Sequence, residues 1–332
     1  MNNAKIIIII PYYGKFNSYF QFWLNSCAEN MNFEWLLITD IVVDDYNIPP
    51  NVKILKISFD ELKEYFQGKF GFKIKLDTPY KLCDYKQYYG FLFEDYIKGY
   101  HFWGYCDCDL IFGDIPSFLS KEYFQNFDKL LRTGHLSFVR NTKQINENFK
   151  KYDTYKISLS SPAIYGYDES VEGYHLGFAG ELLDNGYRFY ANDNLAADVD
   201  FRFFPFQIVS NPEKPCVFLY DYGKIYKIVR DDNKQLLKEE VMYVHLQKRK
   251  MEIKCDLNKK RYLIIPNAFI EYSEELLKSD LFWDTVTPNK EDYFNFKKEK
   301  KNALRRDLVR LLHEPNKAKS ICYRFLSRRK SK

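Results

Sequence analysis

A chain of 332 residues, 46% of them apolar, can bury a sizeable core in one large domain, with or without appendages. No window approaches the roughly 20 apolar residues that a membrane span needs, and the opening MNNAKIIIII lacks the apolar length and cleavage site of a signal peptide. The seven cysteines are odd in number and lack the spacing of a disulfide framework, so we expect free thiols in a cytoplasmic protein.

Strands and helices alternate through the first ~130 residues. The run AKIIIIIPYYG at 4–14 predicts a strand covered on both faces, as in the parallel sheets of α/β proteins. The elements predicted after it are a helix at 17–30, strands at 34–40 and 51–58, helices at 59–67 and 84–99, and a strand at 101–107. This alternation predicts a Rossmann-like sheet wound by right-handed crossovers.

The second half of the chain is less regular. A helix is predicted over 171–186, where Gly186 ends it, and short strands separated by turns follow. The economical interpretation is one α/β domain with a mixed β extension. We place its boundaries at 1–250, with 251–296 packed on it and 297–332 as a basic helical tail.

Two aspartates, Asp107 and Asp109, follow the predicted strand in HFWGYCDCDLIFGDI. Ligands of open α/β sheets gather at the carboxyl ends of strands, and side chains i and i+2 of an extended chain point the same way. The two carboxylates should therefore converge, while Cys106 and Cys108 turn to the other side. Like charges side by side raise each other's pKa unless a cation neutralises them, and a hard divalent metal is the natural partner. The C-x-C spacing, with no second Cys/His pair nearby, argues against zinc.

Three scaffolds use such an aspartate pair. An EF-hand loop requires D-x-D-x-D-G, and Ile111 and Phe112 occupy its fifth and sixth positions, which excludes it. A haloacid-dehalogenase phosphatase carries D-x-D on its first strand, where this chain has IIIIIPYYG. The D-x-D of nucleotide-sugar glycosyltransferases ends a mid-sheet strand and holds Mg²⁺ or Mn²⁺ against the donor diphosphate. The third scaffold matches the position observed here, and a solvated loop pair is the alternative.

Five segments together resemble a bacterial glycosyltransferase-like family of the GT-A fold, whose members occur near capsule and O-antigen polysaccharide genes. The segments are IIIIIPYYGKFNSYFQFWLNSC, EWLLITD, PYKLCDYKQYYG, FWGYCDCDLIFGDI and MYVHLQKRK. The resemblance covers roughly residues 4–250 and is most specific around the aspartate pair. It implies a GT-A, Rossmann-like mixed sheet flanked by helices, and it does not extend to the tail.

The resemblance also implies a nucleotide site at the ends of the first two strands. Pro11, Tyr12 and Tyr13 end the first strand, where such enzymes begin to hold the nucleotide. Asp40, after the second strand, is similar to an acidic residue that contacts the base. For the two tyrosines, packing in the core is the alternative role.

Further residues implied by the resemblance serve the diphosphate and the metal. Lys81 and Asp84 lie in the stretch that usually approaches the nucleotide or diphosphate, and solvation is the alternative for the lysine. Asp107 and Asp109 resemble the metal pair. His245 resembles the late histidine that completes the metal site, with a core or surface position as the alternative, and Lys248 would face phosphate.

Sugar transfer to an acceptor hydroxyl with inversion requires a general base, usually Asp or Glu. Asp168 and Glu169 stand at the start of the helix predicted near 171–186, where the helix dipole favours the carboxylate form. We expect one of them to be this base; a purely helix-stabilising role is the alternative. Acids within 193–204 are available to bind acceptor hydroxyls.

The net charge of +5 is unevenly distributed. Residues 297–332 hold 14 Lys/Arg and 3 Asp/Glu, whereas the rest of the chain holds 36 Lys/Arg and 42 Asp/Glu. One face of a helix predicted in this tail carries four leucines, Leu304, Leu308, Leu311 and Leu312. A basic amphipathic helix favours peripheral attachment to the anionic inner face of the cytoplasmic membrane, and packing on the protein's own body is the alternative. No nucleic-acid motif accompanies the tail, so no nucleic-acid partner is expected.

The sequence thus leads to a functional hypothesis. We expect a Mn²⁺- or Mg²⁺-dependent glycosyltransferase of the hexosyltransferase type that takes its sugar from a nucleotide sugar, with UDP as the expected nucleotide. The expected acceptor is a growing surface polysaccharide, such as capsule or lipopolysaccharide glycan, which can be lipid-linked. The alternative is a protein of the same fold that binds nucleotide sugar or carbohydrate without catalysis.

Overall fold

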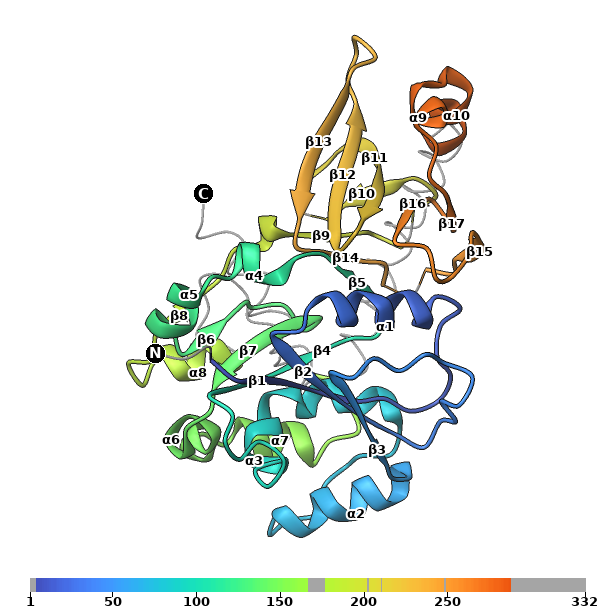
Figure 1. The fold of residues 1–332 in the computed structure, drawn as a ribbon. Helices are drawn as coiled ribbons and strands as arrows, with labels where there is room; N and C mark the ends of the chain where they lie inside the picture. Colours follow the sequence, from blue (N-terminus) through green and yellow to red (C-terminus); the bar gives the residue numbers. More distant parts are fainter. Residues whose placement is uncertain (1–3, 167–176, 202, 210, 248, 288–332) are drawn as a thin grey trace, which may run out of the picture.

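The computed structural model describes residues 4–166, 177–201, 203–209, 211–247 and 249–287, and the predicted tail at 297–332 lies outside them. Figure 1 shows a central sheet with helices on both faces and a second, mainly antiparallel sheet stacked above it. The predicted class, a mixed α/β sheet flanked by helices, is confirmed. None of the described helices is long and apolar enough to span a membrane.

The central sheet contains seven strands in the order β3-β2-β1-β4-β7-β6-β8. Their bounds are β1 Ile6–Pro11, β2 Phe33–Thr39, β3 Val52–Lys56, β4 Phe102–Cys106, β6 Lys129–Leu130, β7 Leu136–Arg140 and β8 Phe189–Tyr190. The first four strands in this order are parallel, whereas β7 runs antiparallel to β4. The strands predicted at 34–40, 51–58 and 101–107 are present as β2, β3 and β4.

The isoleucine run of β1 is covered on both faces of the sheet, as predicted. Ile8 and Ile10 belong to the core cluster that contains Trp23 of the first helix, whereas Ile7 and Ile9 belong to a second cluster on the other face. Each of these four side chains is at most 2% exposed. Because successive side chains of a strand point to opposite faces, an uninterrupted apolar run requires cover on both sides.

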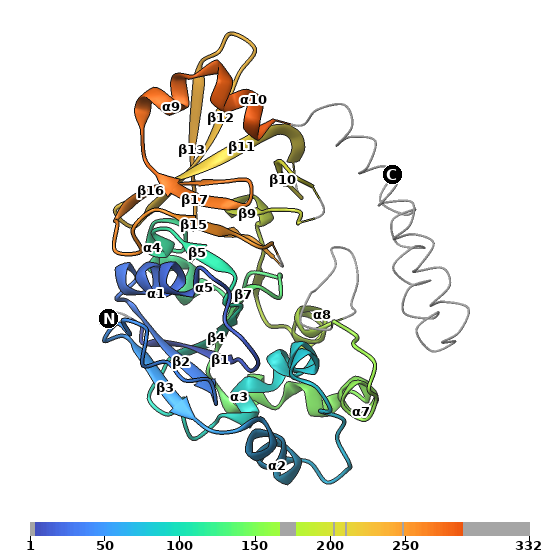
Figure 2. The ribbon, with the colours of Figure 1, turned by 90° about the vertical axis from the view of Figure 1, so that its right-hand side faces the viewer.

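Helices cover both faces of the central sheet (Figure 2). On one face, α1 (Phe20–Glu29) lies between the central sheet and the upper sheet, and α4 (Ile115–Phe118) and α5 (Lys121–Asn126) contribute to the same core cluster as α1. Phe22 of α1 packs on Tyr262 of the upper sheet at 4.5 Å between ring centroids. The other face is covered by α2 Phe59–Lys69, η1 Pro79–Tyr88, α3 Tyr89–Leu92, α6 Lys143–Asn146, η2 Asn148–Lys151, α7 Thr154–Leu159 and α8 Phe178–Leu183.

A small three-stranded sheet determines the geometry of the site. It has the order β5-β14-β9, with bounds Leu110–Phe112, Tyr243–His245 and Ala196–Asp198. The β14 residue His245 stands opposite Leu110 of β5 and opposite Asp198 of β9. Three segments that are distant in sequence therefore meet directly after β4.

The upper sheet has the order β13-β12-β11-β16-β17-β15, and β10 pairs with β11. Its strands are β10 Phe206–Ile208, β11 Asn211–Asp221, β12 Lys224–Arg230, β13 Leu236–Val241, β15 Glu252–Lys254, β16 Arg261–Ile265 and β17 Ala268–Glu271. Helices α9 (Glu274–Lys278) and α10 (Asp280–Val286) pack on it. Residues 251–287 join the strands before residue 250 through the pairing of β16 with β11.

Two predicted helices differ from the observed elements. The helix predicted at 84–99 is a 3₁₀ helix, η1, followed by the single turn α3. Lys81, Asp84 and Lys86 of η1 are buried, so this segment lacks the continuous apolar stripe of a long amphipathic helix. The helix predicted at 171–186 is observed as α8 from Phe178, and 171–176 lie outside the described residues. Gly186 follows it with φ +78°, the left-handed conformation that ends many helices.

Candidate functional site

A crevice of about 1900 Å³ lies at the carboxyl ends of β1 and β4. Its walls come from the end of β1, from η1, from the link between β4 and β5, and from segments around β9 and β14. This is the edge at which open α/β sheets bind ligands. Since pockets for drug-sized ligands typically measure about 300–1,000 Å³, the crevice has room for more than one substrate.

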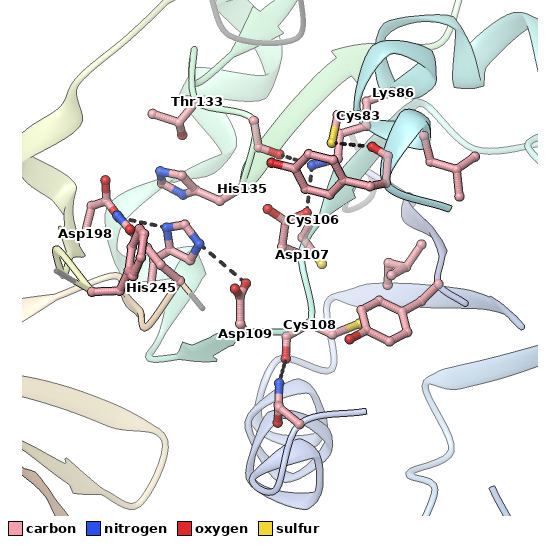
Figure 3. A pocket seen from close by; sticks show the side chains of 18 of the residues that line it. Cys83, Lys86, Cys106, Asp107, Cys108, Asp109, Thr133, His135, Asp198 and His245 are labelled. Carbon is pink, nitrogen blue, oxygen red and sulfur yellow. Dashed lines mark hydrogen bonds and ion pairs between the residues drawn. The ribbon is translucent and has the colours of Figure 1, made fainter. Parts of the chain in front are cut away.

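Asp107 and Asp109 lie in the link between β4 and β5, and both line the crevice. Together with His245 they offer ligand atoms that all lie within 4.8 Å of one another (Figure 3). Cys106 and Cys108 belong to the core cluster and are only 4% and 2% exposed, although both also border the crevice. The backbone of this link is also fixed, because Asn17 Nδ2 donates a hydrogen bond of 2.8 Å to the Cys108 carbonyl.

The imidazole of His245 is oriented by a carboxylate on its far side. Nδ1 lies 2.8 Å from Oδ1 of Asp198, which also accepts a hydrogen bond from Gln247. Nε2 is thereby directed to Asp109, at 3.4 Å from Oδ1. Burial alone would lower the pKa of His245, but the carboxylates of Asp109 and Asp198 outweigh it and raise that pKa to about 10.

The two aspartates have different electrostatic environments. Lys86 Nζ lies 2.7 Å from Oδ1 of Asp107 and also donates to the Gly134 carbonyl. Desolvation raises the pKa of Asp107, but Lys86 and His245 outweigh it and hold that pKa below its ordinary value. Burial raises the pKa of Asp109, and the charge of Asp107 adds to this shift.

This group of residues fits a divalent cation. Two carboxylates and one imidazole form a suitable donor set for a Mn²⁺-class ion. Oδ1 of Asp109 is buried without a hydrogen-bond partner among the described residues, and 3.4 Å from His245 Nε2 is too long for a good hydrogen bond. A ligating histidine usually contacts a carboxylate through its other nitrogen, as His245 does with Asp198.

A second histidine extends this group. The ring of His135 stacks on His245 at 4.4 Å between centroids, and its Nδ1 lies 2.8 Å from the Tyr243 hydroxyl. Burial and the neighbouring His245 lower the pKa of His135 to about 3, so its imidazole is neutral. His135, Asp198 and His245 form a second set of possible ligands, again within 4.8 Å of one another.

The nucleotide residues predicted from the resemblance occupy different positions. Pro11, Tyr12 and Tyr13 line the crevice. The ring of Tyr12 stacks on that of Phe16, with 5.1 Å between ring centroids. Asp40 directly follows β2 and is exposed outside the residues that line the crevice. It lies close enough to Tyr13 to contribute, after burial, to the raised pKa of that tyrosine.

Lys81 and Asp84 form a buried ion pair, with 2.6 Å between Nζ and Oδ2. Lys81 donates to the Ser158 carbonyl, and Asp84 accepts hydrogen bonds from the backbone N–H groups of Tyr165 and Gly166. These contacts fasten the segment around 158–166 to η1 instead of facing the crevice. Asp168, Glu169 and Lys248, predicted as catalytic or phosphate-binding residues, lie outside the described residues.

Sequence reasoning missed three residues of the site. Lys86 stands in the same PYKLCDYKQYYG segment as Lys81, but the irregular phase of a 3₁₀ helix hid which lysine faces the crevice. Asp198 and His135 meet His245 through strand pairing and ring stacking over long sequence separations. The acids of 193–204 were the available signal for Asp198.

Several solved glycosyltransferase structures are distantly similar to this chain. The galactosyltransferase LgtC, in complex with donor and acceptor sugar analogs, is 9% identical with a TM-score of 0.33, over 58% of this chain and 75% of that one. Mouse xyloside xylosyltransferase 1, in its apo form, is 10% identical with a TM-score of 0.33, over 59% and 88%. A glycosyltransferase involved in glycosylation of the major capsid of PBCV-1 is 11% identical with a TM-score of 0.31, over 59% and 85%. Similarity at this level transfers neither substrate nor reaction to the present chain.

Comparison of the sequence with protein families identifies the family of the chain. No curated protein matches the chain at a significant level. A family described as "Family of unknown function (DUF6625)" matches residues 8–273, which include the crevice, its aspartate pair and His245. On this evidence the chain belongs to the DUF6625 family of unknown function.

Proposed function

We propose that the protein is a metal-dependent glycosyltransferase that moves a sugar from a nucleotide sugar, with UDP as the nucleotide, to a glycan acceptor. Asp107, Asp109 and His245 would hold a Mn²⁺ or Mg²⁺ ion. The acceptor would be a growing surface polysaccharide such as capsule or lipopolysaccharide glycan, either free or lipid-linked.

One observation carries this proposal. An aspartate pair and an oriented histidine meet at the carboxyl edge of a mixed α/β sheet, and a buried oxygen of Asp109 has no hydrogen-bond partner among the described residues. The crevice beside them is large enough for a nucleotide sugar and an acceptor together.

Transfer leaves negative charge on the departing diphosphate. When bound, a divalent ion acts as a Lewis acid toward that charge. Lys86 would add preorganised positive charge at the same edge, since its Nζ is fixed by Asp107 and Gly134. Tyr12 and Tyr13 would form the apolar wall on which the nucleotide rests. Asp168 or Glu169 remains the predicted general base.

The arrangement does not favour the phosphatase interpretation. The dehalogenase scaffold needs its nucleophilic aspartate at the end of the first strand. Here β1 ends at Pro11 and continues into Tyr12 and Tyr13, whereas the aspartate pair follows β4.

Donor turnover tests the proposal. Full-length protein is mixed with a panel of nucleotide sugars and Mn²⁺, and release of free nucleotide is measured beside the shift in melting temperature. We expect one nucleotide sugar to stabilise the protein only when Mn²⁺ is present, and to be slowly hydrolysed. Asp109→Asn should abolish both effects, whereas the same change at the exposed Asp45 should alter neither.

The outcomes distinguish the hypotheses. Metal-dependent donor binding without turnover would support the alternative of a non-catalytic binding protein. Turnover that persists in Asp109→Asn, or that is unaffected by chelation of metal, would contradict the proposal.

A further inference from the structure

The crevice continues past the metal-ligand group along the segment 193–209. In Figure 3, Asp198 and His135 lie on one side of the aspartate pair, and Cys83 and Lys86 lie on the other. The wall formed by η1 and the end of β1 is where the nucleotide is proposed to bind. The opposite wall is therefore available to the second substrate.

We propose that the segment 193–209 forms the acceptor subsite, and that Phe201 is the platform on which a pyranose ring of the acceptor glycan stacks. This inference rests on the proposed function, because it assigns the second substrate of the same crevice. It concerns only residues that the structure describes between 193 and 209.

The first support is exposed apolar surface within a polar crevice. Phe201 lines the crevice and is 46% exposed, and Val209, which also lines it, is 55% exposed. A pyranose ring has an apolar C–H face and a polar rim, so an open aromatic face next to polar groups is complementary to it.

The second support is that hydrogen bonds hold the backbone of the described residues around Phe201. The guanidinium of Arg249 is buried and donates to the carbonyls of Phe204 at 2.7 Å and Asp200 at 3.0 Å, and also to that of Phe203. Within the segment, Val209 N–H donates to the Asp198 carbonyl and Asp200 N–H to the Gln207 carbonyl. A preorganised loop loses little conformational entropy when a ligand binds.

The third support is a pair of charged groups that line the same crevice as Phe201. Arg132 and Asp193 both line the crevice and form an ion pair, with 2.9 Å between Nε and Oδ1. A carboxylate accepts and a guanidinium donates, so the pair is able to bind neighbouring sugar hydroxyls in both senses. Asp198, which belongs to the same segment 193–209, contacts His245, so the proposed subsite adjoins the proposed metal site.

Saturation-transfer NMR tests the inference on the full chain in the presence of UDP and diamagnetic Mg²⁺, because paramagnetic Mn²⁺ would broaden the signals of a nearby ligand. The probes are p-nitrophenyl glycosides of glucose, galactose, N-acetylglucosamine and rhamnose, with p-nitrophenol alone as the reference for binding through the aglycone. We expect at least one glycoside to receive saturation on its ring protons. In Phe201→Ala this transfer should fall roughly fivefold, because an aromatic contact is lost.

Matched variants separate stacking from general damage. Phe201→Tyr keeps the aromatic face and should retain the signal. Tyr96→Ala should retain it as well, because it removes a similarly exposed ring outside the segment 193–209 and outside the crevice. The melting temperatures of all variants establish that they are folded. Unchanged transfer in Phe201→Ala, or no glycoside bound by protein that does bind UDP, would overturn the inference. Absence of UDP binding would instead count against the proposed function.

Discussion

Nδ1 of His245 lies 2.8 Å from Oδ1 of Asp198, and this contact decides which imidazole nitrogen faces Asp109. Asp198 comes from β9 and His245 from β14, so the orientation of the histidine depends on parallel pairing of two short strands. A residue that does not itself belong to the Asp107–Asp109–His245 group thus determines the geometry of that group.

Asp198→Ala should therefore weaken Mn²⁺ binding roughly 10- to 100-fold, because His245 loses the partner that holds its ring. Calorimetric titration of Mn²⁺ into protein saturated with UDP measures the change. Asp198→Asn keeps an oxygen that accepts from Nδ1–H of His245, so its Mn²⁺ affinity should lie between those of Asp198→Ala and the unmodified protein. Asp45→Ala, at an exposed position, should bind Mn²⁺ as tightly as the unmodified protein. Equal Mn²⁺ affinity in all four proteins would remove Asp198 from this role.

Lys86→Met should lower nucleotide-sugar turnover roughly 100-fold, since it removes the preorganised cation beside Asp107. Lys86→Arg keeps the charge but changes its shape, and should retain an intermediate rate. Initial rates of nucleotide release, compared at equal protein concentration, give the result. A Lys86→Met protein with the rate of the unmodified chain would show that this lysine only fixes the loop around Gly134.

Lys81→Met should behave differently from Lys86→Met, although the two lysines belong to the same 3₁₀ helix. The Lys81–Asp84 pair is 2% and 0% exposed, so removal of the lysine leaves a buried carboxylate without its cation. Loss of one partner of a buried pair typically costs about 3–5 kcal/mol of unfolding free energy. Urea denaturation measures this loss, and a midpoint equal to that of the unmodified protein would contradict it.

The sequence was sufficient to predict the strands that carry the aspartate pair. The isoleucine run of β1 is apolar at every position, a pattern that requires cover on both faces of the sheet. The i, i+2 spacing of Asp107 and Asp109 predicts that both carboxylates point to the same side of the chain, and both line the crevice. These are local properties, because they follow from the geometry of an extended chain.

The partners of those residues were harder to predict because they depend on tertiary contacts. Nothing in the sequence near Asp198 indicates that β9 pairs with β14, a strand that begins 45 residues later in the chain. Likewise, the choice between Lys81 and Lys86 depends on the phase of η1, which a pattern based on α-helical periodicity places wrongly.

The predicted tail leads to a test of its own. Full-length protein should float with anionic vesicles at low salt, whereas a chain ending at Phe296 should remain with the unbound fraction. Added salt should release the full-length protein, because screening weakens the attraction of basic residues to anionic lipid. Identical flotation of the two proteins at low salt would contradict membrane attachment through 297–332.

The buried Glu181 of α8 should make stability depend on pH. Burial raises its pKa to about 7, although a hydrogen bond from Thr154 opposes the shift. In the unfolded chain this carboxyl ionises near its ordinary pKa of 4.5. The stability that its neutral form supports is therefore fully present below pH 4.5 and is lost as the pH rises through 7.

Glu181→Gln should remove this dependence, because the amide stays neutral and its oxygen still accepts from Thr154. Relative to the unmodified protein, the variant should gain about 2–3 kcal/mol of unfolding free energy between pH 4.5 and pH 8. Urea denaturation at several pH values gives both curves, and their difference isolates Glu181 from groups such as His135 that titrate in both proteins. A difference that is constant across this range would mean that Glu181 ionises in the folded protein at the same pKa as in the unfolded chain.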